Sequence, residues 1–250
     1  MKREVIVVTG AYGTDTVQQR GGQAAMLPII ADAGADGVEI RRELFSPGEL
    51  DNLPQLAQEI ARQQLFAVYS APEPLFTPEH HVNPKLPALL AEAQALKARR
   101  LKLSLGHYQP GFDFTELKVD LMQHPVQLVV ENDQTADCGI LSPMNAFLHA
   151  AEDNQLPISM TFDMANWHWV GQDPSAAAER LARHVGYIHV KAAVQGPRGW
   201  RAIALDDAGD DWRRLLAQLP ADVPRGIEFP LQGDDLEAVT RHYVNLLRAE

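Results

Sequence analysis

Apolar and polar residues follow one another along this chain in a repeating order that predicts a strand and then a helix. Short runs rich in Val, Ile and Leu are bounded by turn residues, and longer segments with apolar residues every three or four positions follow them. The predicted strands cover residues 5–9, 37–40, 66–70, 101–105, 127–131, 158–163, 187–190 and 226–229. The predicted helices cover residues 23–33, 47–63, 84–98, 114–122, 143–153, 174–184, 211–218 and 234–249.

Each predicted strand leads into a helix, and no two predicted strands are joined by a hairpin. This order predicts a parallel sheet with helical crossovers. Eight such units in 250 residues fit an α/β fold of one (β/α)8 TIM barrel, with residues 1–250 as a single domain. An open doubly wound sheet is less favoured, because the turn from Gly10 to Gly13 lacks the glycine spacing of a dinucleotide site.

The charge balance disfavours several classes of partner. Twenty-two basic against 33 acidic residues give a net charge of −11, which repels nucleic-acid phosphates and anionic membrane surfaces. Cys138 is the only cysteine, so no disulfide within the chain is expected. We see no signal-peptide pattern and no apolar run of roughly 20 residues. We therefore expect a cytoplasmic protein that binds neither nucleic acid nor membrane.

Four ionisable residues lie at the ends of the last four predicted strands: Glu131, Asp163, His189 and Glu228. Active sites of β/α barrels lie where the strands end. Three carboxylates and one imidazole form a hard ligand set that suits Mn²⁺, Mg²⁺ or Co²⁺ and is less typical of Zn²⁺. Each residue alone is often an ordinary polar strand end, but the joint pattern favours a metal site.

This ligand set predicts proton-transfer chemistry on a sugar. A divalent metal that chelates a carbonyl oxygen and the neighbouring hydroxyl makes the hydrogen on the adjacent carbon acidic. Glu131 and Glu228 are the candidate catalytic pair, in which one removes that proton and the other returns it. The expected result is epimerisation or isomerisation through an enediolate.

Cationic residues near the same strand ends indicate an acidic substrate. Strand alternation places Glu39 and Arg41 on one face of a strand. Lys102, Lys191 and either Arg41 or Arg198 are candidates to bind a carboxylate or a phosphate, with Glu39 beside them in the predicted substrate site. The alternative is that Lys102 and Lys191 only neutralise Glu39 and the metal-binding carboxylates.

The start of the last predicted helix bears on the choice between a phosphate and a carboxylate. Asp234 and Asp235 follow Gly233 there, and their carboxylates would compete with a phosphate for the helix N–H groups. This favours a free sugar acid over a sugar phosphate.

The order and spacing of the four candidate ligands resemble those of the xylose-isomerase-like barrels, the sugar isomerase and epimerase superfamily that includes the ketose 3-epimerases. Residues 130–135, 161–163 with 166–167, 186–192 and 227–235 more narrowly resemble the epimerases encoded with 2-ketogluconate utilisation enzymes. The resemblance implies a divalent metal held by Glu131, Asp163, His189 and Glu228, with Glu131 and Glu228 as the acid/base pair.

One position departs from the pattern of the ketose 3-epimerases. They usually have a histidine three residues after the metal-binding aspartate, where it contacts substrate oxygens, and this chain has Asn166 there. His168, two residues further on, is the candidate to replace it. We take Asn166 and His168 as candidate substrate-binding residues.

The leading hypothesis is a metal-dependent epimerase or isomerase of a keto-sugar or keto-sugar acid such as 2-ketogluconate. A dehydratase or lyase would begin with the same proton abstraction, and a ketose 3-epimerase acting on a neutral or phosphorylated sugar is a further alternative. The superfamily's endonucleases need more histidine ligands and a basic surface, and a silent binding protein would have lost a ligand. A homo-oligomer is left open, because the apolar pairs Phe147/Ala151 and Tyr243/Leu247 fit either the core or a dimer contact.

Overall fold

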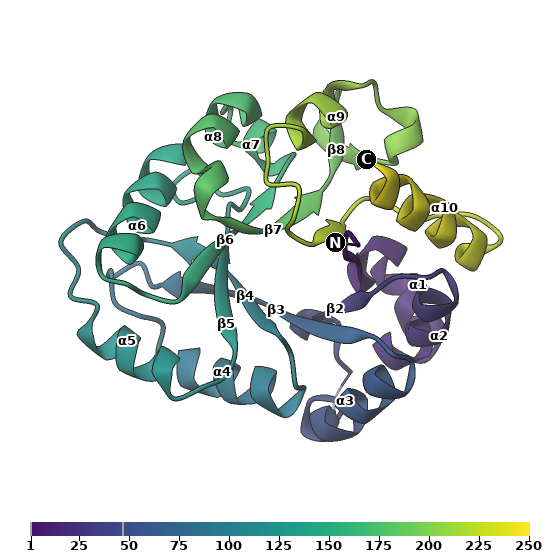
Figure 1. The fold of residues 1–250 in the computed structure, drawn as a ribbon, viewed down its shortest axis with the longest axis horizontal. Coiled ribbons are helices and arrows are strands. Elements are labelled where there is room, and N and C mark those ends of the chain that lie inside the picture. The colour runs from purple at the N-terminus through teal and green to yellow at the C-terminus, as the bar shows by residue number, and fades with distance from the viewer. Residues whose placement is uncertain (1, 47) are drawn as a thin grey trace.

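Eight parallel strands close into a barrel in the computed structural model, which describes residues 2–46 and 48–250. Neighbours around the barrel follow the order β1, β10, β7, β6, β5, β4, β3, β2, and helices form a ring outside them (Figure 1). The predicted TIM barrel is therefore confirmed. Its strands are β1 (Val5–Val8), β2 (Gly37–Arg41), β3 (Phe66–Phe76), β4 (Arg100–Gly106), β5 (Gln127–Glu131), β6 (Ile158–Asp163), β7 (Val185–Val190) and β10 (Arg225–Ile227).

The helices between the strands cover the outside of the barrel. They are α1 (Thr14–Gln19), α2 (Leu27–Asp32), α3 (Leu53–Arg62), α4 (Leu86–Ala95), α5 (Thr115–Met122), α6 (Leu141–Asp153), α7 (Asn166–Trp169), α8 (Pro174–Leu181), α9 (Asp211–Leu216) and α10 (Leu236–Ala249). Short 3-10 turns are η1 (Thr9–Tyr12), η2 (Gln23–Met26), η3 (Arg42–Leu44), η4 (Leu50–Asn52), η5 (Ala182–His184) and η6 (Leu205–Asp207). None of the described helices is long and apolar enough to cross a membrane.

The helix boundaries differ from the prediction at a few places. Helices α1 and α7 have only 6 and 4 residues, too few for an apolar period to show in the sequence. The helix predicted for residues 47–63 begins as α3 at Leu53, after the 3-10 turn η4. Pro47, which was predicted to open that helix, lies outside the described residues.

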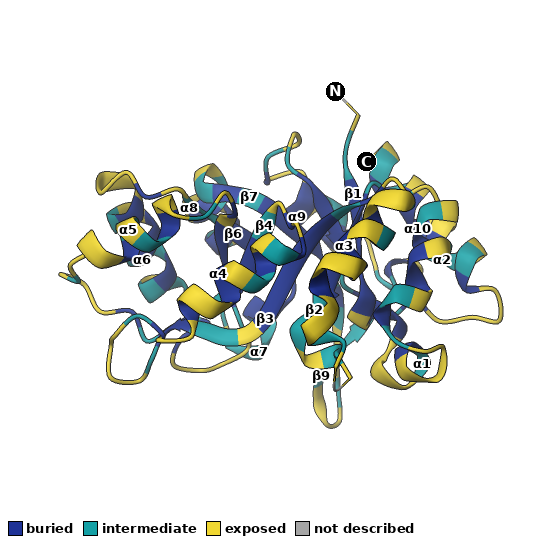
Figure 2. Cartoon of the chain, turned by 90° about the horizontal axis from the view of Figure 1, so that it is seen from below, coloured by how far each residue is buried: buried dark blue, intermediate teal, exposed yellow. Residues whose placement is uncertain are grey.

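The prediction that the chain contains no hairpin is wrong. Strands β8 (Ala192–Gly196) and β9 (Gly199–Ile203) form an antiparallel pair directly after β7. These strands are short and half exposed, so their apolar pattern is weak, although Gly196, Pro197 and Gly199 did mark a turn. The hairpin projects from the end of the barrel opposite the N-terminus (Figure 2). Strand carboxyl ends lie at that end, so the hairpin stands beside the candidate site.

The barrel interior is apolar at the amino ends of the strands and polar toward their carboxyl ends. Ile6, Val68 and Tyr187 come from strands that are not neighbours, yet they pack together with no exposed surface, so they meet inside the barrel. Above them the buried polar residues include Glu39, Lys102 and His189. A barrel interior is usually filled by aliphatic side chains. The polar upper layers therefore belong to the site.

The main apolar core lies between the barrel and its helices. Figure 2 shows buried strands in the middle and exposed outer faces on the helices. Phe147, Ala151, Tyr243 and Leu247 are all buried in this core. These residues, which were candidates for a dimer contact, are therefore core residues.

An ion pair fastens α4 to the barrel wall. Arg42 donates two hydrogen bonds to the Glu92 carboxylate at 2.8 and 3.0 Å, and the Tyr69 hydroxyl donates a third at 2.6 Å. Partial burial tends to raise the pKa of Glu92, but these three donors hold it below its usual value. Ionised Glu92 therefore stabilises the folded chain.

Replacing Glu92 tests this contribution. Because the pKa of Glu92 is lower in the folded than in the unfolded chain, its contribution is present above the unfolded pKa and is lost as the pH falls through the folded pKa. We expect Glu92→Gln to lower the free energy of unfolding by about 1–3 kcal/mol at pH 7. The difference from wild type should shrink below about pH 4, as denaturant titrations across pH would show. The exposed Glu179→Gln is the control, and equal effects of the two substitutions would contradict the assignment.

Candidate metal centre

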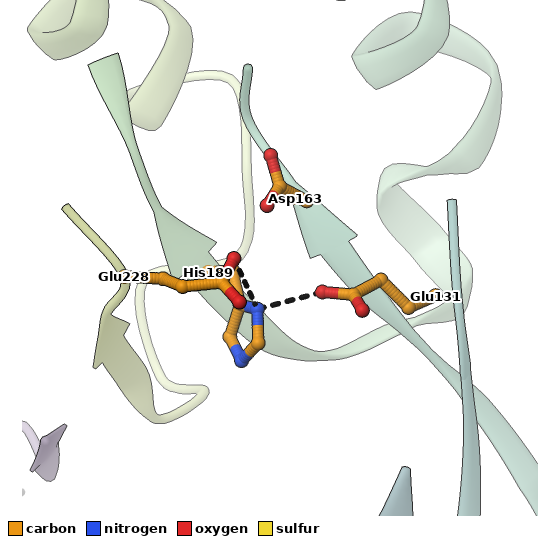
Figure 3. Close-up of side chains that lie close together, drawn as sticks. All are labelled: Glu131, Asp163, His189 and Glu228. Atoms are coloured by element: carbon orange, nitrogen blue, oxygen red, sulfur yellow. Dashed lines mark hydrogen bonds and ion pairs between the residues drawn. The ribbon is translucent and has the colours of Figure 1, made fainter. Parts of the chain in front are cut away.

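Four side chains converge at the carboxyl ends of neighbouring strands. Glu131 ends β5, Asp163 ends β6, His189 lies in β7, and Glu228 follows β10. One ligand atom from each lies within 4.8 Å of the others. In Figure 3, Glu131 and Glu228 approach the His189 ring from opposite sides, and Asp163 lies above it. The sequence prediction had placed these four residues in one metal site, and the barrel brings them together.

The His189 ring is held in one orientation by residues on its Nε2 side, deeper in the barrel. Its Nε2 lies 2.8 Å from an oxygen of Glu39, and the Tyr187 hydroxyl donates to that oxygen at 2.9 Å. Gly226 stands beside this ring, and a Cβ there would come within 3.0 Å of His189 and 2.4 Å of the Tyr187 hydroxyl. A histidine that gives its Nε2 proton to a carboxylate presents Nδ1 as a lone pair, the arrangement typical of metal-binding histidines.

Nδ1 of His189 faces the two glutamates. It lies 2.6 Å from Oε1 of Glu131 and 3.0 Å from Oε2 of Glu228. The other oxygen of each glutamate is held by a cation: Lys102 pairs with Oε2 of Glu131, and Arg41 donates to Oε1 of Glu228 at 2.9 Å. Each glutamate therefore keeps one oxygen directed at Nδ1 of His189.

Asp163 likewise has one oxygen held by donors outside the cluster. Its Oδ1 accepts the backbone N–H groups of Ala165 and Asn166, both at 2.8 Å. Asn132 holds the Asp163 backbone, because its side chain accepts the Asp163 N–H at 2.9 Å and donates to the Asp163 carbonyl at 3.0 Å. Only Oδ2 of Asp163 remains to face the cluster.

These contacts test whether the residues suit a metal. Oε1 of Glu131 is buried, and its contact with Nδ1 of His189 at 2.6 Å lacks the geometry of a hydrogen bond. A buried acceptor without a donor is costly, so a cation is the natural partner of this oxygen. Three oxygens and one imidazole nitrogen converge, and the remaining heteroatoms of these groups are already bonded. The donor set fits a divalent cation, with His189 as its single nitrogen ligand.

The electrostatics of the cluster also favour a cation. Burial raises the pKa of Asp163 to about 7 in spite of Lys191, because the neighbouring Glu228 and Glu131 oppose its ionisation. Burial would likewise raise the pKa of Glu131, but Lys102 and His189 hold it at about 2. Burial lowers the pKa of His189, yet the surrounding glutamates raise it well above its usual value. Acids crowded this closely gain from added positive charge.

The predicted substrate-binding residues Glu39 and Lys102 lie below the cluster. Glu39 has no exposed surface and is bonded to His189, so its position differs from the predicted substrate contact. Lys102 is 3% exposed, with its ammonium on Glu131 and 3.8 Å from Glu39. Their positions match the alternative in which Lys102 neutralises buried carboxylates.

Lys191 and Asn166 lie at the cluster itself. The Lys191 ammonium is 3.2 Å from Oδ2 of Asp163, 3.2 Å from Oε2 of Glu228 and 3.3 Å from the Asn166 side-chain oxygen. It therefore contacts two of the three carboxylate oxygens that face the cluster. Of the described residues, Lys191 alone lines both of the cavities that adjoin the site.

His168 and Arg198 lie further out. The His168 ring stacks on Trp200 of β9, with ring centres 4.4 Å apart and planes 17° from parallel. Arg198 is exposed in the turn between β8 and β9, away from the four candidate ligands. The structure thus does not bring Arg198 into the cluster.

The site contains groups that the sequence did not assign. Arg41 was considered only for binding an anion, and the structure places it on Glu228. Gln23 clamps the Arg41 backbone, accepting its N–H and donating to its carbonyl, both at 2.8 Å. Trp200 belongs to the hairpin that was not foreseen. Alternation in β2 did indicate that Arg41 points inward, but nothing local indicated Gln23.

No family model matches the chain, and no curated protein matches its sequence. The chain is similar in structure to an IolI protein with a bound zinc atom, at 12% identity and a TM-score of 0.74, over 100% of this chain and 98% of that one. It is similar to a D-allulose 3-epimerase from Methylomonas sp. in complex with D-allulose (13%, TM-score 0.70, 100% and 98%). It is also similar to the probable 3-DHS dehydratase AsbF from Bacillus anthracis (13%, TM-score 0.65, 98% and 98%).

At these identities the likeness shows the fold alone. The (β/α)8 barrel expected from the sequence is supported at that level. None of these three proteins is named for 2-ketogluconate, so that substrate remains a proposal.

Metal binding should appear as a gain in stability. A ligand that binds only the folded chain stabilises it by about 2.7 kcal/mol at one hundred times its Kd. We expect Mn²⁺, Co²⁺ or Mg²⁺ to raise the melting temperature in a saturable manner that chelator reverses. Asp163→Asn should remove most of this rise, because an amide can still accept at Oδ1 but offers no anionic oxygen to the cluster. Exposed Asp51→Asn is the control, and an undiminished rise in Asp163→Asn would exclude Asp163 as a ligand.

Lys191 should compete with the metal. Its ammonium neutralises the same oxygens of Asp163 and Glu228 that face the cluster. Two unit charges about 4 Å apart interact by about 4 kcal/mol at an effective dielectric constant of 20. We expect Lys191→Met to tighten Mn²⁺ binding at least tenfold in calorimetric titrations and to lower the melting temperature without metal. Lys118→Met on α5 is the control, and weaker Mn²⁺ binding in Lys191→Met would show that Lys191 supports the metal instead.

Proposed function

We propose that this protein is a divalent-metal-dependent epimerase or isomerase of a keto-sugar or keto-sugar acid. One observation carries the proposal: each carboxylate of the cluster has one oxygen held by a donor outside the cluster, and one ligand atom from each of the four residues lies within 4.8 Å of the others. A bound divalent cation would polarise a substrate carbonyl and acidify the hydrogen on the next carbon. The residues around it would then move that proton.

Glu131 and Glu228 are the proposed acid/base pair. They approach from opposite sides of His189 (Figure 3), as required to remove a proton from one face of a carbon and return it to the other. Lys102 and His189 keep the pKa of Glu131 low, and His189 and Lys191 do the same for Glu228, so both glutamates are ionised. Either glutamate can therefore act as the base. The cation bonded to its other oxygen, Lys102 for Glu131 and Arg41 for Glu228, fixes the orientation of its carboxylate.

The proposed substrate carries a carboxylate, with 2-ketogluconate as the working example. A cavity of about 420 Å³, here called the mouth cavity, opens above Glu228 and is lined by Arg41 and Lys191. These two cations could bind a carboxylate, although Glu43 at the outer edge already pairs with Arg41 at 2.7 Å. A sugar phosphate is less favoured, because Asp235 already accepts the Ala238 N–H at the start of α10.

A dehydratase or lyase is the main alternative. It would use the same base to form the enediolate and then expel a neighbouring hydroxyl. Similarity to the probable 3-DHS dehydratase AsbF keeps this alternative open, as does similarity to the D-allulose 3-epimerase for a ketose 3-epimerase acting on a neutral sugar. The mass of the product separates epimerase from lyase.

Proton exchange into solvent is the test of the proposal. Purified protein with Mn²⁺ is incubated in D₂O with 2-ketogluconate and a panel of ketoses, and proton NMR follows the signal beside the carbonyl. We expect that signal to disappear, and chelator to stop its loss. Glu228→Gln should slow exchange by about 10²–10⁴-fold, the usual contribution of a general base. New sugar signals would indicate an epimerase or isomerase, and loss of water a lyase.

Glu179→Gln is the matched control for these measurements. Metal loading of Glu228→Gln is checked by thermal shift, since Glu228 is also a candidate ligand. Exchange that persists with chelator, or that Glu228→Gln leaves unchanged, would contradict the proposal. Absence of exchange across the whole panel would remove the proposed substrate class.

A further inference from the structure

A second cavity lies on the other side of Lys191 from the mouth cavity. This side cavity has a volume of about 480 Å³ and is bounded by α7, the β8–β9 hairpin and the starts of α8 and α9. Among the described residues of its lining, Lys191 alone has a side chain bonded to a carboxylate of the metal cluster. Metal binding and proton transfer therefore do not account for the side cavity.

Rings and aliphatic chains form much of its wall. His168 stacks on Trp200 at 4.4 Å, and Ile203 and Leu215 lie in the same lining. Trp212 also lines the cavity and is 4% exposed. These rings and aliphatic chains suit an apolar part of a ligand.

The charges around the side cavity disfavour an anion. Asp173 caps α8, where its two oxygens accept the N–H groups of Ser175 and Ala176 at 3.1 and 3.3 Å. Asp211 pairs with Arg214, and Asp207 adds a third carboxylate. Lys191, the other cation of the lining, is bonded to the metal cluster. A ligand in the side cavity should therefore carry no negative charge.

The size of the side cavity and its position beside Lys191 indicate that it could hold a second part of the substrate. Pockets of about 300–1,000 Å³ usually hold a whole small-molecule ligand. The side cavity reaches that size by itself and meets the mouth cavity at Lys191. A single keto-sugar placed over the metal ligands and Glu228 would leave the side cavity unused.

We propose that the side cavity is a subsite for an uncharged ring joined to the reacting sugar, as in the aglycone of a glycoside. The sugar lies over the metal cluster and the mouth cavity, the ring packs against Trp200 and Trp212, and the bond between them passes Lys191. This inference rests on the proposed function and narrows its substrate class to keto-sugars that carry a ring substituent.

Binding of model glycosides tests the subsite without turnover. Protein loaded with Mn²⁺ is titrated calorimetrically with phenyl β-D-glucopyranoside and with methyl β-D-glucopyranoside, which share the sugar and differ in the ring. Because contact between aromatic rings contributes about 0.5–1.5 kcal/mol beyond area burial, we expect the phenyl compound to bind about tenfold more tightly. Binding of the two within twofold, or of neither, would overturn the proposal.

Three variants test whether the preference for the phenyl compound arises in the side cavity. Val194→Trp fills the side cavity from β8, at a side chain that is 37% exposed and so tolerates a larger group, and Trp200→Ala removes one wall. Both should abolish the preference for the phenyl compound. Trp169→Ala is the matched control, since Trp169 lies 6.4 Å from Trp200 but not in the lining. A preference that survives Val194→Trp places the ring elsewhere and overturns the subsite.

Solvent exchange of a free keto-sugar separates the two proposals. If the subsite is wrong and the function right, Mn²⁺-dependent exchange remains while the phenyl preference is absent. If the function is wrong, exchange is absent whatever the glycosides do. In Val194→Trp, exchange of the free keto-sugar should stay within twofold of wild type, because Val194 contacts none of the metal cluster.

Discussion

The carboxylates at the mouth of this barrel can be buried because each has one oxygen bonded to a fixed donor. Backbone N–H groups hold Asp163, Lys102 holds Glu131, and Arg41 holds Glu228. Burying an unpaired carboxylate costs several kcal/mol, so these donors are a condition for the cluster to exist. They also set the direction of each carboxylate, since its second oxygen is left to face the cluster. The same contacts therefore stabilise the folded chain and shape the metal centre.

Glu39 extends this arrangement one layer deeper. It accepts from Nε2 of His189 and from Tyr187 and lies 3.8 Å from Lys102, with no exposed surface. A carboxylate behind a ligating histidine fixes its ring and its tautomer. Depth within the barrel thus decides the role of each acid. Glu39, which lies deeper, orients the His189 ring, and the acids at the strand ends turn one oxygen toward the cluster.

Much of the fold follows from periodicity, and its exceptions have physical causes. Strands buried on both faces show as continuous apolar runs, and the helices outside show apolar residues every three to four positions. Helices α1 and α7 are too short to show a period, and the β8–β9 hairpin is half exposed and so lacks a clear apolar face. These missed elements lie in the loops after the strands. The loops carry His168 and Trp200, which is why the surroundings of the cluster were less predictable than the cluster.

The sequence by itself determined the barrel and the convergence of Glu131, Asp163, His189 and Glu228, because parallel strands of one barrel end on the same face. It did not determine which cations pair with which acids. Lys102 lies within β4, Lys191 follows β7 and Arg41 ends β2. They bond to Glu131, to Asp163 with Glu228, and to Glu228. Those pairings join residues up to 187 positions apart, and only the closed barrel sets their distances. Strand spacing, twist and side-chain packing decide them, and none of these is local to a stretch of sequence.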